Sequence, residues 1–388
     1  MVTADPVLEH RYNDDLLAEQ EDREYARTIF PDLLHVLDHP ALRGEFERYN
    51  VMSNKAKRWV HRLGLFAIAL AAIALLSSAA TPILNGILEI RDLDPWVVAQ
   101  VKTLKGVAVW FEIAGLIGAG IAIGGLWISK QKKQWLQCRL MTERLRVWHF
   151  QMLIHRGKDI EESCNTADPQ AIQNFEEKRA KWFTVFKHEH EGKLDSILHN
   201  LIESPEASYI PLHDGLSPYS PARPVLDRVF EAYKALRLKH QAEYAAHRLQ
   251  KSTDEPIWKP HKWPVNVLKS RLSTVTGTCI LVALAVSAYI VFGHFAHWPA
   301  AENNALPALI LCLLVLNVAA RSVQDGLAVR EESQRLSDYA HEVGYLLTKF
   351  ETSNDRDVKL QLMQDMERAA IEEMKDFLRA HFEARFIL

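Results

Sequence analysis

The sequence predicts an all-α integral membrane protein, with four transmembrane helices in two hairpins and a long-helix cytoplasmic bundle. Four apolar stretches lie at residues 64–86, 107–128, 272–293 and 305–321. Each has about the 20 residues that a helix needs to cross a bilayer core. The mean hydropathy of −0.12 is too low for a chain made only of such spans, so most of the chain is expected in water. No stretch shows the sustained period-two alternation that is typical of β-strands.

Composition divides the chain into five segments. Residues 1–40 form an N-terminal cytoplasmic segment, and residues 353–388 form a C-terminal helix. Between them lie a first repeat at 41–160, a cytoplasmic helix with a Pro-rich linker at 161–224, and a second repeat at 225–352. Each repeat consists of an amphipathic helix, a transmembrane hairpin and a long cytoplasmic helix. The prolines concentrated at the end of the third segment mark the boundary between the two halves.

Helical periodicity also predicts where helices continue beyond the spans. The apolar positions of residues 41–62 recur at helical spacing, so an amphipathic helix should lead into the first span without a break. The second span is predicted to continue to about Gly157 and the fourth to about Phe350, because no helix breaker interrupts either stretch. The Asp-Pro pair at 168–169 is typical of a helix start. We expect a single helix from there to about Ser204.

The two halves of the chain resemble each other. Residues 46–63 and 230–249 share a Phe-Glu-x-Tyr start and a His-Arg-Leu end. Residues 139–148 and 330–339 also match, and they keep three pairs of residues in step: Arg139 with Arg330, Arg144 with Arg335, and Leu145 with Leu336. Because this self-similarity recurs in the same order around both hairpins, the sequence indicates an internal duplication.

The order of amphipathic helix, two-span hairpin and long helix with an Arg-Leu-x-x-aromatic segment resembles the SLATT family. This is a family of two-span membrane effectors of bacterial anti-phage and conflict systems. The resemblance covers about 45–155 and 228–350, so the chain looks like a tandem pair, with the Hailong-type effector as its nearest analogue. The resemblance implies a homo-oligomeric membrane effector that depolarises the inner membrane when it senses a nucleotide or oligonucleotide signal. It also implies a nucleotide-synthesising partner enzyme.

Flanking charge predicts the orientation of the spans. Lysine and arginine residues cluster before the first and third apolar stretches and after the second and fourth, whereas the loop at 294–304 has none. Positive charge stays on the cytoplasmic side. We therefore expect a multi-pass protein of the inner membrane, in contact with the lipid bilayer and with both termini in the cytoplasm.

The helix that leaves the second span is strongly basic and is the predicted ligand site. Arginine forks match the oxygens of a phosphate. The candidate residues for binding the signal are Lys132, Arg139, Arg144, Arg146, Arg330 and Arg335. Two other interpretations remain open. Lysines next to a membrane set topology and contact anionic lipid, and the arginines could form ion pairs with acids of the final helix, such as Glu372 and Glu373.

Two polar residues within the spans are the predicted pore-lining residues, Glu112 and Asn317. Ionisable groups in a membrane are costly and usually face a cavity or a partner, and a ring of Glu112 side chains would favour cations. Alternatively, Glu112 lies at the outer interface and meets water. The glycines from Gly115 to Gly125 allow close helix approach, either within the hairpin or between subunits.

Motifs for catalysis and metal binding are absent from the sequence. There is no Gly-rich phosphate loop, no nucleophile elbow, and no HExxH or CxxC pair. His188 and His190 point to different sides of a helix and cannot chelate together. We therefore expect no enzyme, no cofactor and no metal. The function predicted is an ion-conducting pore gated by a cytosolic signal, and the alternative is a non-conducting scaffold whose helical bundle docks a partner protein.

Overall fold

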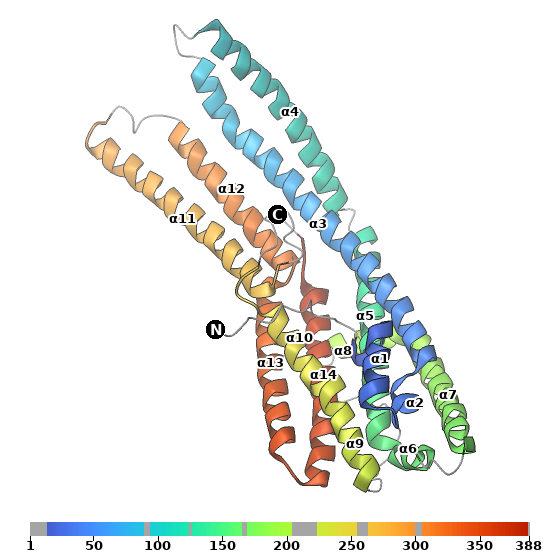
Figure 1. Cartoon of the computed structure of the whole chain (residues 1–388). Helices are drawn as coiled ribbons and strands as arrows, with labels where there is room; N and C mark the ends of the chain where they lie inside the picture. The colour runs from blue at the N-terminus through green and yellow to red at the C-terminus, as the bar shows by residue number, and fades with distance from the viewer. Residues whose placement is uncertain are drawn as a thin grey trace. The chain divides into compact units, whose positions relative to one another are not determined.

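The computed structural model describes residues 14–88, 94–123, 126–164, 169–203, 223–253, 263–298 and 305–386. Every regular element in these ranges is helical, which confirms the all-α prediction (Figure 1). The chain divides into two compact units. We call Met1–Lys55, Lys133–Lys251 and Glu332–Phe382 the bundle unit, and Ala56–Lys132, Ser252–Glu331 and Glu383–Leu388 the apolar unit, with reference to their described residues.

The apolar unit contains the helices that fit a membrane. Three helical stretches are long and apolar enough to span one: Leu34–Asn85, Val265–Phe295 and Ala305–Gly326. They include three of the four predicted spans. The remaining span, 107–128, falls partly outside the described residues. Its described residues are helical and belong to α4 (Pro95–Ile123) and to the start of α5 (Leu126–His155).

Two helical hairpins lie within the apolar unit. In the first, α4 packs beside α3 (Pro40–Leu88), with Gly115 close to Ala74 and Gly118 close to Leu70 (Figure 1). A Cβ atom on either glycine would overlap the neighbouring side chain. In the second hairpin, α11 (Val265–Phe295) packs along α12 (Ala305–Gly326). Of the two interpretations of the glycine spacing, these contacts support packing within the hairpin.

The bundle unit is built around α5. All ten residues from Met141 to Phe150 are buried, so this part of the helix is covered on every side. Trp148 packs against Phe183 and Phe186, and Phe150 packs edge-on against Tyr233. The surrounding elements are η1 (Asp14–Leu16), α1 (Gln20–Ile29), α2 (Leu34–Leu37), the start of α3, α6 (Gly157–Ser163), α7 (Pro169–Glu191), α8 (Leu194–Glu203), α9 (Arg223–Tyr233), the π-helix η2 (Lys234–Lys239), α10 (His240–Arg248), α13 (Val329–Thr352) and α14 (Arg356–Glu383).

Some predicted helix continuities are confirmed and others are wrong. The helix α3 runs without a break from the amphipathic segment into the first span, as predicted. The single helix expected at 169–204 is instead two helices, because the chain turns at Gly192 and Lys193, where glycine weakens the helix. The fourth span also does not continue to Phe350 as one helix. It ends at Gly326, and Ala328 then adopts a left-handed φ of 48°, which terminates a helix.

Candidate functional site

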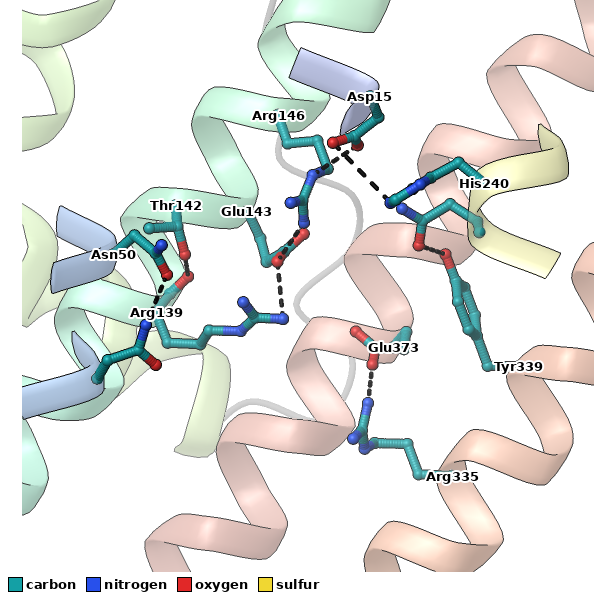
Figure 2. Close-up of polar contacts among 12 residues, drawn as sticks. Asp15, Asn50, Arg139, Thr142, Glu143, Arg146, His240, Arg335, Tyr339 and Glu373 are labelled. Carbon is teal, nitrogen blue, oxygen red and sulfur yellow. Dashed lines mark hydrogen bonds and ion pairs between the residues drawn. The ribbon is translucent and has the colours of Figure 1, made fainter. Parts of the chain in front are cut away.

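A network of buried charged side chains lies in the core of the bundle unit (Figure 2). One face of α5 presents Arg139, Glu143 and Arg146, which are three or four residues apart and therefore neighbours on a helix. The Glu143 carboxylate binds Arg146 at 2.7 Å and Arg139 at 2.8 Å. Arg146 Nε also lies 2.8 Å from Oδ2 of Asp15, a residue of η1. The N-terminal segment thus contributes an acid to the centre of the bundle.

A second arginine joins this network from the π-helix η2. Arg237 is completely buried and forms two parallel bonds to Glu367 of α14, from Nε and from Nη2, each 2.9 Å long. The Tyr233 hydroxyl donates to the same carboxylate at 2.6 Å. Arg237 Nη1 and His240 Nε2 each lie 3.9 Å from an Asp15 oxygen. Asp15 is therefore surrounded by three basic side chains, although neither of its oxygens has a hydrogen-bond partner in the part of the chain that the structure describes.

The electrostatics of this network favour the charged forms of Glu143 and Arg237, whereas burial raises the pKa of Glu367. Burial by itself would raise the pKa of Glu143, but the nearby Arg139, Arg146 and Arg237 lower it to about 2. Burial likewise disfavours a charged Arg237, and the Glu367 carboxylate outweighs this effect and raises the pKa of Arg237. The charges of Asp15, Glu143 and Glu367 balance those of the three arginines. The buried members of this network have lost their hydration. Removal of one member of a pair therefore leaves its partner as an unpaired buried charge, which strongly destabilises the fold.

Arg335 lies in a separate ionic cluster of α13 and α14. Its guanidinium binds Glu332 at 2.7 Å and also pairs with Glu373 (Figure 2). Oε1 of Glu332 is 2.6 Å from His381 Nε2. The guanidinium lies over the Phe377 ring. Of the interpretations left open by the sequence, the ion pair with an acid of the final helix is the one observed for Arg335.

Only some of the predicted ligand-binding residues are exposed to solvent. Arg139, Arg146 and Arg335 bind protein carboxylates, and the last two are more than nine-tenths buried, because neighbouring helices cover α5 and α13. The guanidinium groups of these three arginines are therefore engaged by carboxylates of the chain itself. Arg330 is exposed, whereas Arg144 is buried and has no hydrogen-bond partner among the described residues. Whether any of these residues binds a signal stays a prediction.

The structure describes the side chain of one of the two predicted pore-lining residues, Asn317. The Asn317 amide donates to the Thr276 carbonyl at 3.0 Å, and the residue is buried between the two helices of its own hairpin. Within one chain Asn317 therefore stabilises α11 against α12 and does not face an open space. Glu112 belongs to α4, but its side chain lies outside the described residues.

The C-terminal residues of the apolar unit contact two of its long helices, α3 and α12. The Phe386 ring lies against Gly64 of α3 and Gly326 of α12, where a Cβ atom on either glycine would overlap the ring. Lys132 Nζ donates to the Ala384 carbonyl at 2.6 Å. Burial and the nearby Arg385 lower the pKa of Lys132 to about 8. The segment at 384–386 thus connects helices of both hairpins.

Substitution Phe386→Ala is expected to weaken the packing of the C-terminal residues against α3 and α12. Loss of the half-buried ring should lower the free energy of unfolding by roughly 1–2 kcal/mol, less than the 3–5 typical of a fully buried phenylalanine. Thermal unfolding in detergent measures the loss, and maleimide labelling of a His61→Cys variant should become faster because His61 contacts the same ring. Phe382→Ala, at a residue that is 52% exposed, is the control. Equal effects of the two substitutions would contradict a specific contribution of the Phe386 ring to the packing of α3 and α12.

Sequence reasoning missed Asp15, Arg237 and Glu367. Arg237 and Glu367 do carry a signal, since each is a charged residue among the apolar positions of an amphipathic helix, where a buried partner is needed. Asp15 carries none, because its burial depends on the path of the N-terminal segment. That path includes a left-handed Leu17, whose carbonyl accepts hydrogen bonds from Arg23 and Arg43.

The structure shows corresponding contacts in the two halves of the bundle unit. The aligned tyrosines Tyr49 and Tyr233 each donate the hydroxyl to a glutamate of a later helix. Phe-x-x-x-His pairs with rings in contact occur on α7 and α14, with ring centroids 4.3 Å apart for Phe186 and His190, which are stacked, and 4.4 Å apart for Phe377 and His381, which are tilted. These pairs are offset in numbering by the same shift that relates Arg144 to Arg335. The duplication therefore extends to the helix that packs on each long helix.

Among the residues that the structure describes, no group of three or more His, Cys, Asp or Glu side chains is arranged to hold a metal ion. Comparisons with protein-family models, with curated proteins and with solved structures found no match to this chain in any of the three.

Proposed function

We propose that this chain is an oligomeric inner-membrane effector of bacterial anti-phage defence. Its spans would form an ion-conducting pore that depolarises the membrane under the control of a cytosolic nucleotide or oligonucleotide signal. The observation that supports this proposal most is the continuity of α3. Residues 40–55 of this helix belong to the bundle unit, and residues 56–88 belong to the apolar unit and include a candidate span.

A helix shared in this way offers a route for gating. Phe46 and Tyr49 of α3 are buried in the core of the bundle unit, so a rearrangement of that core acts on the same backbone that enters the span. A ligand shifts such an equilibrium only by its difference in affinity for the two states. The network around Glu143 and Arg146 provides that difference, because a phosphate group competes with carboxylates for guanidinium groups.

Ion flux in liposomes tests the proposal. The full chain, reconstituted in potassium-loaded vesicles, is expected to release potassium at a rate that changes when a nucleotide is added outside. The probes are ATP, cyclic dinucleotides and short single-stranded oligonucleotides. Glu112→Gln should reduce the preference for cations, measured as a shift in reversal potential, whereas Glu351→Gln at an exposed residue should not. Inserted protein that never conducts, with or without these probes, would reject the pore and favour the scaffold.

A further inference from the structure

Arg144 is a buried cation that forms no ion pair with any residue that the structure describes. The residue is 2% exposed, and none of its three guanidinium nitrogens has a hydrogen-bond partner in the described part of the chain. Burial lowers the pKa of Arg144 to about 10, and only the nearby Glu189 opposes this effect. By contrast Arg146, two residues along α5, pairs with two carboxylates. A buried charge of this kind is costly unless a partner neutralises it.

The second repeat shows what this position lacks. Arg335 aligns with Arg144 and pairs with two carboxylates, those of Glu332 and Glu373. Under the same shift in numbering, the corresponding positions of the first repeat are Met141 and Trp182, which are apolar. The arginine and the Phe-x-x-x-His pair beside it are kept, and both acids are absent. The first repeat therefore has the cationic half of the arrangement and lacks two negative charges.

His190, at the end of α7, lies near Arg144. Burial, together with the charges of Arg144 and of Lys193 in the turn that follows α7, lowers the pKa of His190 to about 4. Glu189, Gly192 and Lys193 are exposed, so this end of α7 is where the surroundings of Arg144 approach the solvent. A Cβ atom on Gly192 would meet open space. Among the described residues, Glu189 is the one acid whose charge acts on Arg144, and it would oppose an anion.

We propose that Arg144, with His190 beside it and Lys193 in the exposed turn that follows α7, forms a binding site for a phosphate group. A phosphate monoester carries about two negative charges and three acceptor oxygens. That is the charge which Glu332 and Glu373 supply to Arg335. Guanidinium forks bind such oxygens in pairs. The inference rests on the proposed function only for the identity of the phosphate compound, since the site itself is independent of any pore.

Thermal unfolding of the full chain in detergent and phosphate-free buffer tests the site, with inorganic phosphate as the probe and chloride at equal ionic strength as the blank. Phosphate should raise the midpoint of the wild-type protein. Arg144→Met should unfold at a higher temperature than wild type without phosphate, because the uncompensated charge is gone, and should not respond to phosphate. Arg335→Met is the matched control. It should unfold at a lower temperature, because two acids lose their partner, and should keep the response to phosphate.

A second set of samples distinguishes a lipid headgroup from a soluble compound as the source of the phosphate. In nanodiscs of phosphatidylglycerol, a lipid headgroup at the site would raise the midpoint of wild type but not of Arg144→Met, relative to phosphatidylcholine. A soluble phosphate compound would leave the two lipids equal and keep the response to inorganic phosphate. An Arg144→Met protein that responds to phosphate as wild type does, or a wild type that responds to neither source, overturns the site. Phosphate binding without ion flux would keep the site and reject the pore.

Discussion

Substitution Glu367→Leu is expected to lower the free energy of unfolding of the bundle unit by about 3–5 kcal/mol, the cost of breaking a buried ion pair by removal of one partner. The carboxylate of Glu367 receives two bonds from Arg237 and one from the Tyr233 hydroxyl, and all three side chains are fully buried. Without it, a guanidinium remains in the core, and its remaining ion pair among the described residues is the long one to Asp15, at 3.9 Å. Chemical denaturation in detergent, followed by tryptophan fluorescence, measures the loss.

The double variant Arg237→Met with Glu367→Leu should recover most of this stability. Replacement of both members of a buried pair by apolar side chains of similar volume is often neutral. Asp376→Leu on the same helix is the control, because its side chain is 62% exposed and its ion pair with Arg379 is long, at 4.0 Å. If Glu367→Leu is as mild as Asp376→Leu, or if the double variant is less stable than Glu367→Leu alone, the pair does not hold the core as described.

Substitution Gly115→Leu is expected to separate α3 from α4. A Cβ atom at this position would overlap that of Ala74 and lie 3.4 Å from the Leu70 carbonyl oxygen, so backbone must move to admit a leucine. Helices in a membrane associate through such close approach, since lipid offers no hydrophobic driving force between them. We expect a loss of about 1–3 kcal/mol from overpacking, measured by unfolding of the reconstituted protein in increasing concentrations of dodecyl sulfate.

Gly106→Leu provides the matched control for this prediction. Gly106 lies on the same helix, and a Cβ atom there would meet nothing within 4 Å. Leucine at this position should be neutral or slightly stabilising, because it favours the helix more than glycine does. The close packing of α3 on α4 would be contradicted by a Gly115→Leu protein that resists dodecyl sulfate as well as the Gly106→Leu protein does.

Local properties of the sequence were sufficient to predict much of the fold. The continuous helix α3, the apolar helices α11 and α12, and the final helix near Arg356–Glu383 follow from periodicity and from the absence of breakers. Glycine spacing on α4 suggested a close helix contact, and Gly115 and Gly118 do make it. The breaks at Gly192 and Ala328 were missed, since each depends on how the chain turns to pack its next helix.

The candidate site was less predictable, because burial and pairing are not properties of one helix. The sequence alone determined that the chain is helical, that it carries apolar segments of membrane length, and that arginines recur at matched positions in its two halves. Only the tertiary structure decided which of these arginines are neutralised. Arg335 and Arg144 occupy aligned positions, yet one meets two carboxylates and the other none, since their counter-ions come from other turns and other helices. Asp15 likewise pairs with Arg146 and Arg237, which are more than 100 residues away in the sequence, so local sequence patterns cannot predict these contacts.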